Sequence, residues 1–373
     1  MLILPNTACV ITLTCGLLFL ASSPRTAWSA EGGTKTPPWL SINVPMEWQT
    51  DANYRSSTAD NERNNMFLKM EPEATINVPA VPGLSFYVHG VLEQVADAGA
   101  NEDRYFKDEG FYIQDLYASY DAGLFGLRGG KMNPGFATAW DQAPGIYGRD
   151  MAKDYEMAER IALSANAAIE PEGWGNHVVT VGTFFLDTSP LQNTIFSKSR
   201  GTLDREDGGV SNTEDFSSFN VLLDGGKFPA FPKLAYHLGY IHQTHGTDGT
   251  EDETGLAAAL TAKFDLGQDL ALTPLVEFVR FSDVGGTENK ERRYLTVSAL
   301  AEWQSWNVAL AYTARETRET GAETLDDYQM QASFGYAFDF GLTADIGWKR
   351  MREDHVVTDT VGFLFTYNFG YSR

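Results

Sequence analysis

The segment 327–338, DYQMQASFGYAF, decides the fold because every second residue in it is apolar or aromatic. Successive side chains of a β-strand point to opposite faces, so this period of two predicts a strand with unlike faces. One face carries Tyr328, Met330, Ala332, Phe334, Tyr336 and Phe338. The other carries Gln329, Gln331, Ser333, Gly335 and Ala337. The segment is therefore predicted to separate an apolar environment from a polar one.

The same pattern recurs along the chain in segments close to the roughly 9 to 11 residues that a tilted strand needs to cross a bilayer. About sixteen strands are predicted, at 41–50, 66–78, 84–96, 109–121, 124–133, 160–170, 176–187, 216–224, 234–245, 253–265, 270–282, 292–303, 306–316, 327–338, 342–353 and 357–369. Outside residues 1–30, no apolar run has the roughly 18 residues of a membrane-spanning helix. A membrane protein of this sequence would cross with strands.

The connections between these strands alternate in length. The short set is 79–83, 122–123, 171–175, 266–269, 304–305 and 339–341, with 225–233 expected as its longer exception. The mostly longer, more polar set is 51–65, 97–108, 134–159, 188–215, 246–252, 283–291 and 317–326. Bacterial outer-membrane barrels have short periplasmic turns and long extracellular loops, whereas a soluble β-sandwich has no reason to alternate. The predicted fold class is all-β, a transmembrane antiparallel β-barrel.

Charged residues occupy the polar face of several predicted strands. Segment 66–78 places Lys69, Glu71 and Glu73 opposite Leu68 and Ile76. Unpaired charges in a dry core cost several kcal/mol each, so this face is expected to line a water-filled lumen. Aromatic residues at strand ends suit the interfacial girdles of a barrel, although packing in an ordinary core is the alternative. These aromatic residues are Trp48, Trp303, Trp306, Trp348 and Tyr367.

The first thirty residues read as a signal peptide, with an apolar run from Ala8 to Ala21 and small residues near Ala30. An uncleaved membrane anchor is the alternative, because the leader lacks a basic start. Residues 31–373 are predicted to form one barrel domain, since no linker interrupts them. Both cysteines, Cys9 and Cys15, lie in the leader, which excludes a disulfide-stapled mature domain. The net charge of −22 argues against a nucleic-acid partner.

One segment interrupts the regular strand pattern. The connection at 134–159, within RGGKMNPGFATAWDQAPGIYGRDMAKDYEMAER at 128–160, is too long and too charged for an ordinary hairpin. It is expected to fold into the barrel mouth and narrow it. The predicted constriction residues are Arg128, Lys131, Asp141, Arg149, Asp150, Lys153, Asp154, Glu156, Glu159 and Arg160. Such charges across a wet gap would select solutes by charge and dipole, unless they pair only to hold the loop.

Further charges are expected on the lumen wall. They are Lys69, Glu71, Glu73, Lys263, Glu302, Arg315, Asp345 and Lys349, and they have both signs. The mixture does not predict a strongly anion-selective pore. Together with the acidic total, it favours weak cation preference or none.

The chain resembles the Gram-negative outer-membrane porins in its leader, its alternating strands, its exceptional third long loop and its aromatic last strand TVGFLFTYNF at 360–369. Locally, GGKMNPGFATAWDQAPGIYGRD is similar to the corresponding segment of porins related to the phosphate-selective branch. The chain departs from the family at its end, because Gly370, Tyr371, Ser372 and Arg373 follow Phe369.

The resemblance implies a passive channel for small hydrophilic solutes and ions, located in the outer membrane of a Gram-negative bacterium. It implies a homotrimer in contact with outer-membrane lipid and lipopolysaccharide, and a third loop folded inward. The sequence has no Gly-rich phosphate-binding loop, no G-x-S-x-G motif and no convincing Ser/His/Asp set, so no cofactor and no enzymatic activity are predicted.

No metal site is predicted from His237, His242 and His245, because His242 lies on the opposite strand face from the other two. Two other functions stay open. A barrel that serves as an adhesin or structural anchor would have a plugged lumen and no conductance. A membrane-embedded hydrolase would place a Ser and a His within hydrogen-bonding distance at the barrel rim.

Overall fold

The computed structural model describes residues 37–56, 63–96, 101–196 and 201–373. The predicted signal peptide at 1–30 lies outside the described residues, as do parts of the 51–65, 97–108 and 188–215 connections. None of the helices in the described ranges combines the length and the apolar character that crossing a membrane requires.

The described chain is almost entirely β-structure. Its strands are β1 (Leu40–Ser56), β2 (Asn64–Met70), β3 (Glu73–Asn77), β4 (Leu84–Gln94), β5 (Arg104–Tyr105), β6 (Glu109–Asp121), β7 (Phe125–Met132), β8 (Arg160–Ile169), β9 (Asn176–Leu186), β10 (Ile195–Phe196), β11 (Ser218–Phe228), β12 (Phe231–Gln243), β13 (Glu253–Ala262), β14 (Phe264–Gly267), β15 (Leu270–Ser282), β16 (Lys290–Trp303), β17 (Trp306–Glu319), β18 (Leu325–Ala337), β19 (Leu342–Glu353) and β20 (Val356–Ser372). Short helical turns are α1 (Ala139–Gln142), η1 (Ala152–Tyr155), η2 (Pro190–Gln192), η3 (Arg205–Asp207) and η4 (Val284–Gly286).

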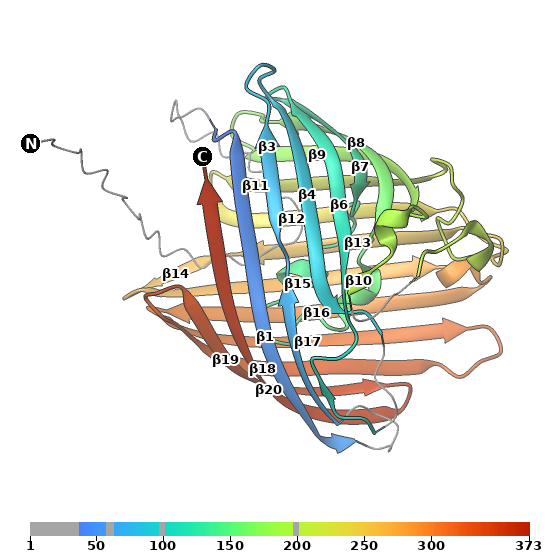
Figure 1. Cartoon of the computed structure of the whole chain (residues 1–373), viewed down its shortest axis with the longest axis vertical. Helices are drawn as coiled ribbons and strands as arrows, with labels where there is room; N and C mark the ends of the chain where they lie inside the picture. Colours follow the sequence, from blue (N-terminus) through green and yellow to red (C-terminus); the bar gives the residue numbers. More distant parts are fainter. Residues whose placement is uncertain (1–36, 57–62, 97–100, 197–200) are drawn as a thin grey trace, which may run out of the picture.

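The sheet closes on itself, because β1 pairs antiparallel with β20 from Ser41↔Ser372 to Ser56↔Thr358. The pairs β2/β3 and β13/β14 each form one wall strand, whereas β5 and β10 lie in loops. The wall therefore has 16 antiparallel strands, which confirms the predicted fold class. In Figure 1 the strands β1, β4 and β6 cross in front of β15–β18 of the opposite wall.

The predicted strand positions are close to those observed, and β6, β15 and β19 have the predicted bounds. The expected longer connection at 225–233 is wrong, because β11 continues to Phe228 and β12 starts at Phe231. A register shift between Gly226 and Phe228 lets this glycine-containing end stay paired with β12. The predicted strand 66–78 is divided at Glu71 and Pro72, since proline has no N–H to donate to the sheet.

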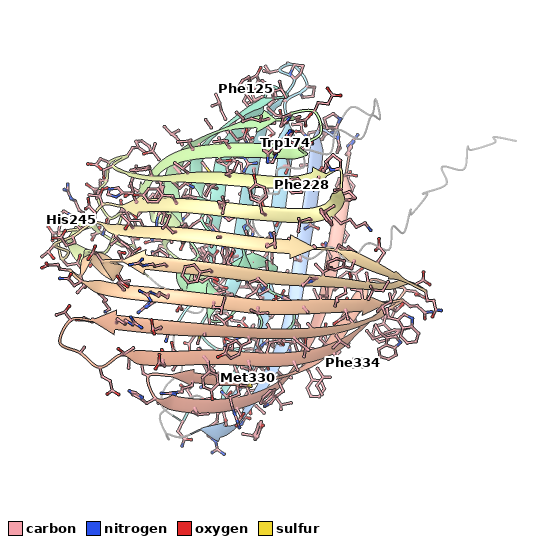
Figure 2. All side chains as sticks on the ribbon, turned by 180° about the vertical axis from the view of Figure 1, so that it is seen from behind. Phe125, Trp174, Phe228, His245, Met330 and Phe334 are labelled. Atoms are coloured by element: carbon pink, nitrogen blue, oxygen red, sulfur yellow. The ribbon has the colours of Figure 1, made fainter. Side chains whose placement is uncertain are left out.

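The two faces of the wall have opposite character, and the apolar face points outward. On β18, Phe334 is 46% exposed, whereas the neighbouring inward residues Gln329 and Gln331 are 2% and 3% exposed. Met330 and Phe334 lie on the outside of the wall nearest the viewer in Figure 2. An apolar outside and polar inside is the arrangement of a barrel that spans a membrane, and it is the reverse of a soluble sandwich.

Aromatic side chains cluster where the strands end in short turns. The Trp306 ring stacks on Phe334 with centroids 5.0 Å apart and meets Tyr336 edge-on at 4.5 Å. Trp48 also stacks on Phe365 at 5.3 Å, but it lies in the middle of β1 rather than at the strand end predicted for it. Figure 2 shows Trp174 and Phe228 near the turn end of the barrel and His245 at the opposite end. These rings suit the interfacial girdle predicted from the sequence.

A charge on the outer face is expected to destabilise the barrel far more than one on the inner face. Leu310 lies on the outward face of β17, four residues after the strand begins at Trp306, and is 54% exposed. We expect Leu310→Arg to lower the free energy of unfolding by about 2–4 kcal/mol in lipid vesicles, measured by denaturant titration. Thr75→Arg, at the lumen cavity, is the control. Equal losses for both variants would contradict a lipid-facing outer surface.

Candidate pore constriction

The 133–159 segment, called L3 from here on, leaves the wall where β7 ends at Met132 and returns at Arg160, the first residue of β8. Pro144, Gly145 and Gly148 interrupt it, so its helical turns α1 and η1 stay at four residues each. Apolar L3 side chains pack with the inner wall in a core that includes Phe136, Trp140, Met151 and Tyr155. L3 therefore lies inside the barrel, as predicted.

Buried polar contacts tie the two ends of L3 together. Lys131 Nζ lies 3.0 Å from Glu159 Oε1 and 2.6 Å from Asp187 Oδ2. The Asn133 side chain donates to Glu156 Oε1 at 3.0 Å and accepts from the backbone N–H of Glu159 at 2.8 Å. Because these contacts join both strand ends, they fix the angle at which L3 turns inward.

A row of directly paired, inward-facing residues crosses the wall beneath L3. It consists of Asp224, His237, Ala259, Glu277, Thr296, Thr313 and Gln329 on strands β11 to β18. These residues are mostly polar in a region where the lumen holds an apolar core. Three of them, His237, Glu277 and Gln329, supply hydrogen-bond partners for L3 backbone groups, which would otherwise be left unsatisfied inside the barrel.

Glu277 is the centre of this row. Its carboxylate accepts hydrogen bonds from the backbone N–H of Thr138 at 2.5 Å and of Ala139 at 3.0 Å. The Thr138 and Tyr155 hydroxyls donate to it at 2.7 Å each. Burial and the Glu277 charge raise the pKa of Tyr155 well above its ordinary value, so this hydroxyl keeps its proton. One carboxylate, 1% exposed, thus holds both helical turns of L3.

The middle of L3 is held by the opposite wall. Gln329 donates to the Tyr147 carbonyl and accepts from the backbone N–H of Met151 at 3.1 Å. Gln331 donates to the Pro144 carbonyl at 3.0 Å. The Tyr147 hydroxyl reaches Asp51 of β1 at 2.6 Å. L3 is consequently fastened on several sides of the barrel.

The acidic side chains of L3 that face this wall are paired with basic side chains. Asp150 forms an ion pair with Lys349 at 2.7 Å. Asp154 forms one with Arg315 at 2.7 Å and accepts a hydrogen bond from the Tyr294 hydroxyl at 2.9 Å. These charges serve to hold the loop, which is the alternative role considered for them from the sequence.

The basic side chains of L3 face a different, acidic part of the wall. Burial opposes the charge of Arg149, but Glu47 and Glu71 outweigh it and raise the pKa of Arg149. Burial lowers the pKa of Lys153, and repulsion from Lys69 and Arg149 lowers it further. Lys69 itself pairs with Glu71 at 2.9 Å and Glu93 at 3.7 Å. Cations of the loop thus lie opposite carboxylates of β1, β4 and the β2–β3 junction.

Glu156 is the L3 acid on this side. Burial raises the pKa of Glu156 to about 7, against the opposing attraction of Lys153 and Lys69. Its charge therefore changes near neutral pH.

A cavity of about 1030 Å³ lies inside the barrel beside the first half of L3. Arg128, Asn133, Asp141 and Asn220 line it, together with residues of strands β3 to β12. The lumen is therefore not filled by its own side chains.

The structure divides the ten predicted constriction residues into groups. Lys131 and Glu159 pair at the ends of L3, and Asp150 and Asp154 pair with the far wall. Arg149, Lys153 and Glu156 form a charged group with the acidic wall, and Arg128 and Asp141 line the cavity. Arg160 donates to the Ala158 carbonyl at 2.6 Å, close to where L3 rejoins the wall.

The predicted lumen charges are distributed along the inner wall. Lys69, Glu71, Arg315 and Lys349 are those described above. Lys263 pairs with Glu302 at 3.2 Å, and Asp345 accepts from Asn307 at 3.2 Å. Glu73 faces its cross-strand partner His89. His242 and His245 both contact Asp252, at 3.4 and 2.7 Å, although the sequence pattern predicts them on opposite faces of the strand.

Sequence reasoning missed the residues that hold L3, above all Glu277, Gln329, His237 and Asp187. The one available signal for Glu277 was a single acid within the apolar run LTPLVEFVRF at 272–281. His237 was considered only as a metal ligand. Glu47 and Glu93 were also missed as charges of the acidic wall.

Three solved outer-membrane porins have similar structures. OprB of Pseudomonas putida is 10% identical over 88% of this chain and 94% of its own, with a TM-score of 0.59. OmpF of Salmonella typhi, solved with daunomycin, is 13% identical over 88% and 97%, also with a TM-score of 0.59. OpdK of Pseudomonas aeruginosa is 10% identical over 89% and 99%, with a TM-score of 0.54.

At such identities the likeness shows the fold alone, which is that of Gram-negative outer-membrane porins. No protein-family model matches the sequence, and no curated protein matches it. The nearer likeness to the phosphate-selective branch is not confirmed and stays a prediction.

Glu277→Ala is expected to release L3 while the barrel stays folded. The substitution leaves buried N–H and O–H donors of Thr138, Ala139 and Tyr155 without an acceptor, which costs about 1–3 kcal/mol. Trypsin should then cleave after Arg149 and Lys153 roughly tenfold faster than in the parent. Glu302→Ala, which removes a lumen carboxylate paired with Lys263, is the matched control. An unchanged cleavage rate in Glu277→Ala would show that Glu277 does not hold the loop.

Proposed function

We propose that the protein is a porin, a water-filled channel for passive diffusion of small hydrophilic solutes and ions across the outer membrane of a Gram-negative bacterium. The observation that carries the proposal is an apolar-outside barrel whose long third loop is fastened inside the lumen beside an open cavity. A barrel of about sixteen strands is too wide to be filled by its own side chains. The fold shared with solved porins supports the same function.

The opposed charges beside L3 give the channel its selectivity. Arg149 and Lys153 present positive charge from the loop, while Glu47, Glu71 and Glu93 present negative charge from the wall. Charges fixed across a narrow wet gap order water and rank solutes by charge and dipole, as rings of charge do in other pores. The net preference for ions is set by the balance of the two groups.

The signal peptide, the oligomeric state and the lipid contacts of the protein are part of the same proposal. The mature chain starts after a signal peptide near residue 30, assembles as a homotrimer and contacts outer-membrane lipid and lipopolysaccharide. It carries no catalytic residues and needs no cofactor.

Reconstitution of the purified protein in a planar bilayer under a salt gradient tests the channel. Step-like currents are expected, and their grouping in threes would support the trimer. An anchor or adhesin with a plugged lumen would give no steps, and that result would overturn the proposal.

Arg149→Gln and Lys153→Gln are each expected to raise the cation-to-anion permeability ratio, because each removes a positive charge from the gap. A unit charge about 6 Å from an ion in water contributes about 0.7 kcal/mol, or roughly a threefold change. Asp141→Asn should shift the ratio the other way. Lys263→Gln, at the paired site with Glu302, is the control. If reversal potentials of the L3 variants equal that of the parent, the constriction assignment is wrong.

Cation preference is also expected to rise with pH through about pH 7. The raised pKa of about 7 keeps Glu156 neutral below that pH and negatively charged above it. The added charge should change the permeability ratio by up to about threefold. Reversal potentials measured from pH 5 to 9 check this, and Glu156→Gln should remove the step. A step of the same size in Glu156→Gln would assign the titration to another group.

A further inference from the structure

His237 on β12 joins the wall to the entrance of L3. Its ring Nδ1 lies 2.7 Å from Asp224 Oδ1, on the directly paired position of β11. Its Nε2 lies 2.7 Å from the carbonyl oxygen of Phe136, in the first part of L3. The His237 side chain is 9% exposed and the Asp224 side chain is 50% exposed, so water reaches the carboxylate but has little access to the imidazole.

Both partners of the His237 ring can only accept hydrogen bonds. A backbone carbonyl has no proton to donate, and an ionised carboxylate has none either. A neutral imidazole carries one N–H, so it can satisfy one of these oxygens and turns a lone pair towards the other. The protonated imidazolium carries two N–H groups and satisfies both. The observed geometry with an ionised Asp224 therefore requires a protonated His237.

Burial disfavours a charge on His237, whereas its hydrogen bonds to Asp224 and Phe136 and the nearby acids favour it. Asp224 faces it from β11 and Glu277 acts on it from β15, and both are acids. On β13 the paired residue Ala259 is uncharged, as is the nearby Thr261. From L3, Phe136 presents its carbonyl dipole. The cavity at His237 is also lined by the titratable residues Glu170, His177, Lys227 and Tyr236.

The L3 backbone is seated closely against this point of the wall. A Cβ at Gly239, two residues along β12, would overlap the Phe136 carbonyl oxygen, so only glycine leaves room there. Asn220 of β11 donates to the carbonyl of the preceding residue, Gly135, at 2.6 Å. The His237 contact thus lies within the group that sets the position of the L3 entrance.

We propose that His237 is a positioning residue, and that its protonated form holds the entrance of L3 in place. As pH rises and His237 loses a proton, L3 should leave this position more often. The proposal rests on the proposed channel function, because it treats L3 as the part that limits the pore. Near neutral pH a histidine exchanges its proton readily, since an unperturbed imidazole titrates at about pH 6.5.

On loss of one proton, the contact to Phe136 is the one that fails. The Nδ1–H bond to Asp224 is charge-assisted and about twice as strong as a neutral one, so the remaining proton stays there. The Nε2 lone pair then faces the Phe136 carbonyl and repels it. A cavity of about 260 Å³ lined by Thr138, Gln142 and Leu275 adjoins His237 and gives this part of L3 space to move.

Single-channel recording with Glu156→Gln as the starting protein tests the proposal, because that variant removes the other titration expected near pH 7. Between pH 5 and pH 9, the rate of brief closures should rise roughly fivefold, as expected for loss of one hydrogen bond.

Adding Asp224→Asn to this protein should remove the increase in closure rate between pH 5 and pH 9. An amide can donate to Nδ1, so a neutral His237 keeps Nε2–H on the Phe136 carbonyl at every pH. Adding His237→Ala should give frequent closures at both pH values. If the starting protein shows no rise, or Asp224→Asn leaves the rise in place, the proposal is overturned.

A second measurement separates this proposal from the channel function. Nitrogen chemical shifts of the His237 ring in detergent report its protonation, and the rate of trypsin cleavage after Arg149 and Lys153 reports release of L3. Both should change over the same pH interval, and in Asp224→Asn the cleavage rate should stay constant. Absence of any current would refute the channel alone, whereas a cleavage rate that is independent of His237 protonation would refute the positioning role alone.

Discussion

The structure depends on how a wide barrel holds a loop across its own interior. A wall of 16 strands encloses more space than its inward side chains can fill, and L3 brings backbone groups into that space. Each of those groups must find a partner, because an unsatisfied buried donor costs as much as a lost hydrogen bond. Glu277 meets this requirement for Thr138, Ala139 and Tyr155 together. The same requirement explains why the mid-barrel row beneath L3 is polar.

The way L3 is fastened also decides which of its charges pair with the wall. Asp150 and Asp154 form ion pairs with Lys349 and Arg315, so these two acidic side chains of the loop face one wall. The helical turn η1 carries both Asp154, which pairs with Arg315, and Lys153, whose charged neighbours include Lys69 and Glu93. The residues that anchor the loop and Lys153, to which the proposed selectivity is assigned, therefore lie in the same short sequence, DMAKD at 150–154.

The sequence predicted the wall well because its signal is local and repeated. In 327–338 the side chain of every second residue must suit lipid, so Phe334 and Gln329 reveal their faces without any tertiary information. The role of Glu277 could not be read in this way, since it depends on which distant loop residue the strand meets. His237 shows the same limit, because its two partners come from the neighbouring strand and from L3. The sequence therefore predicts which charged and polar side chains face the lumen, but not which partners they contact there.

The inward turn of L3 has a structural consequence for the wall, and the next loop compensates for it. Strand β6 pairs with β7 only from Leu116 to Asp121, so residues 109–115 of β6 would form an open edge. Open edges are unstable in a membrane barrel, where every backbone group needs a partner. The short strand β10 pairs with Phe111 and Gly110 and covers part of that edge. Lys131, paired with both Glu159 and Asp187, joins the root of L3 to the loop that carries β10. The inward fold of L3 leaves part of β6 without a neighbouring strand. The following loop covers part of that edge through β10, so the two loops are structurally connected.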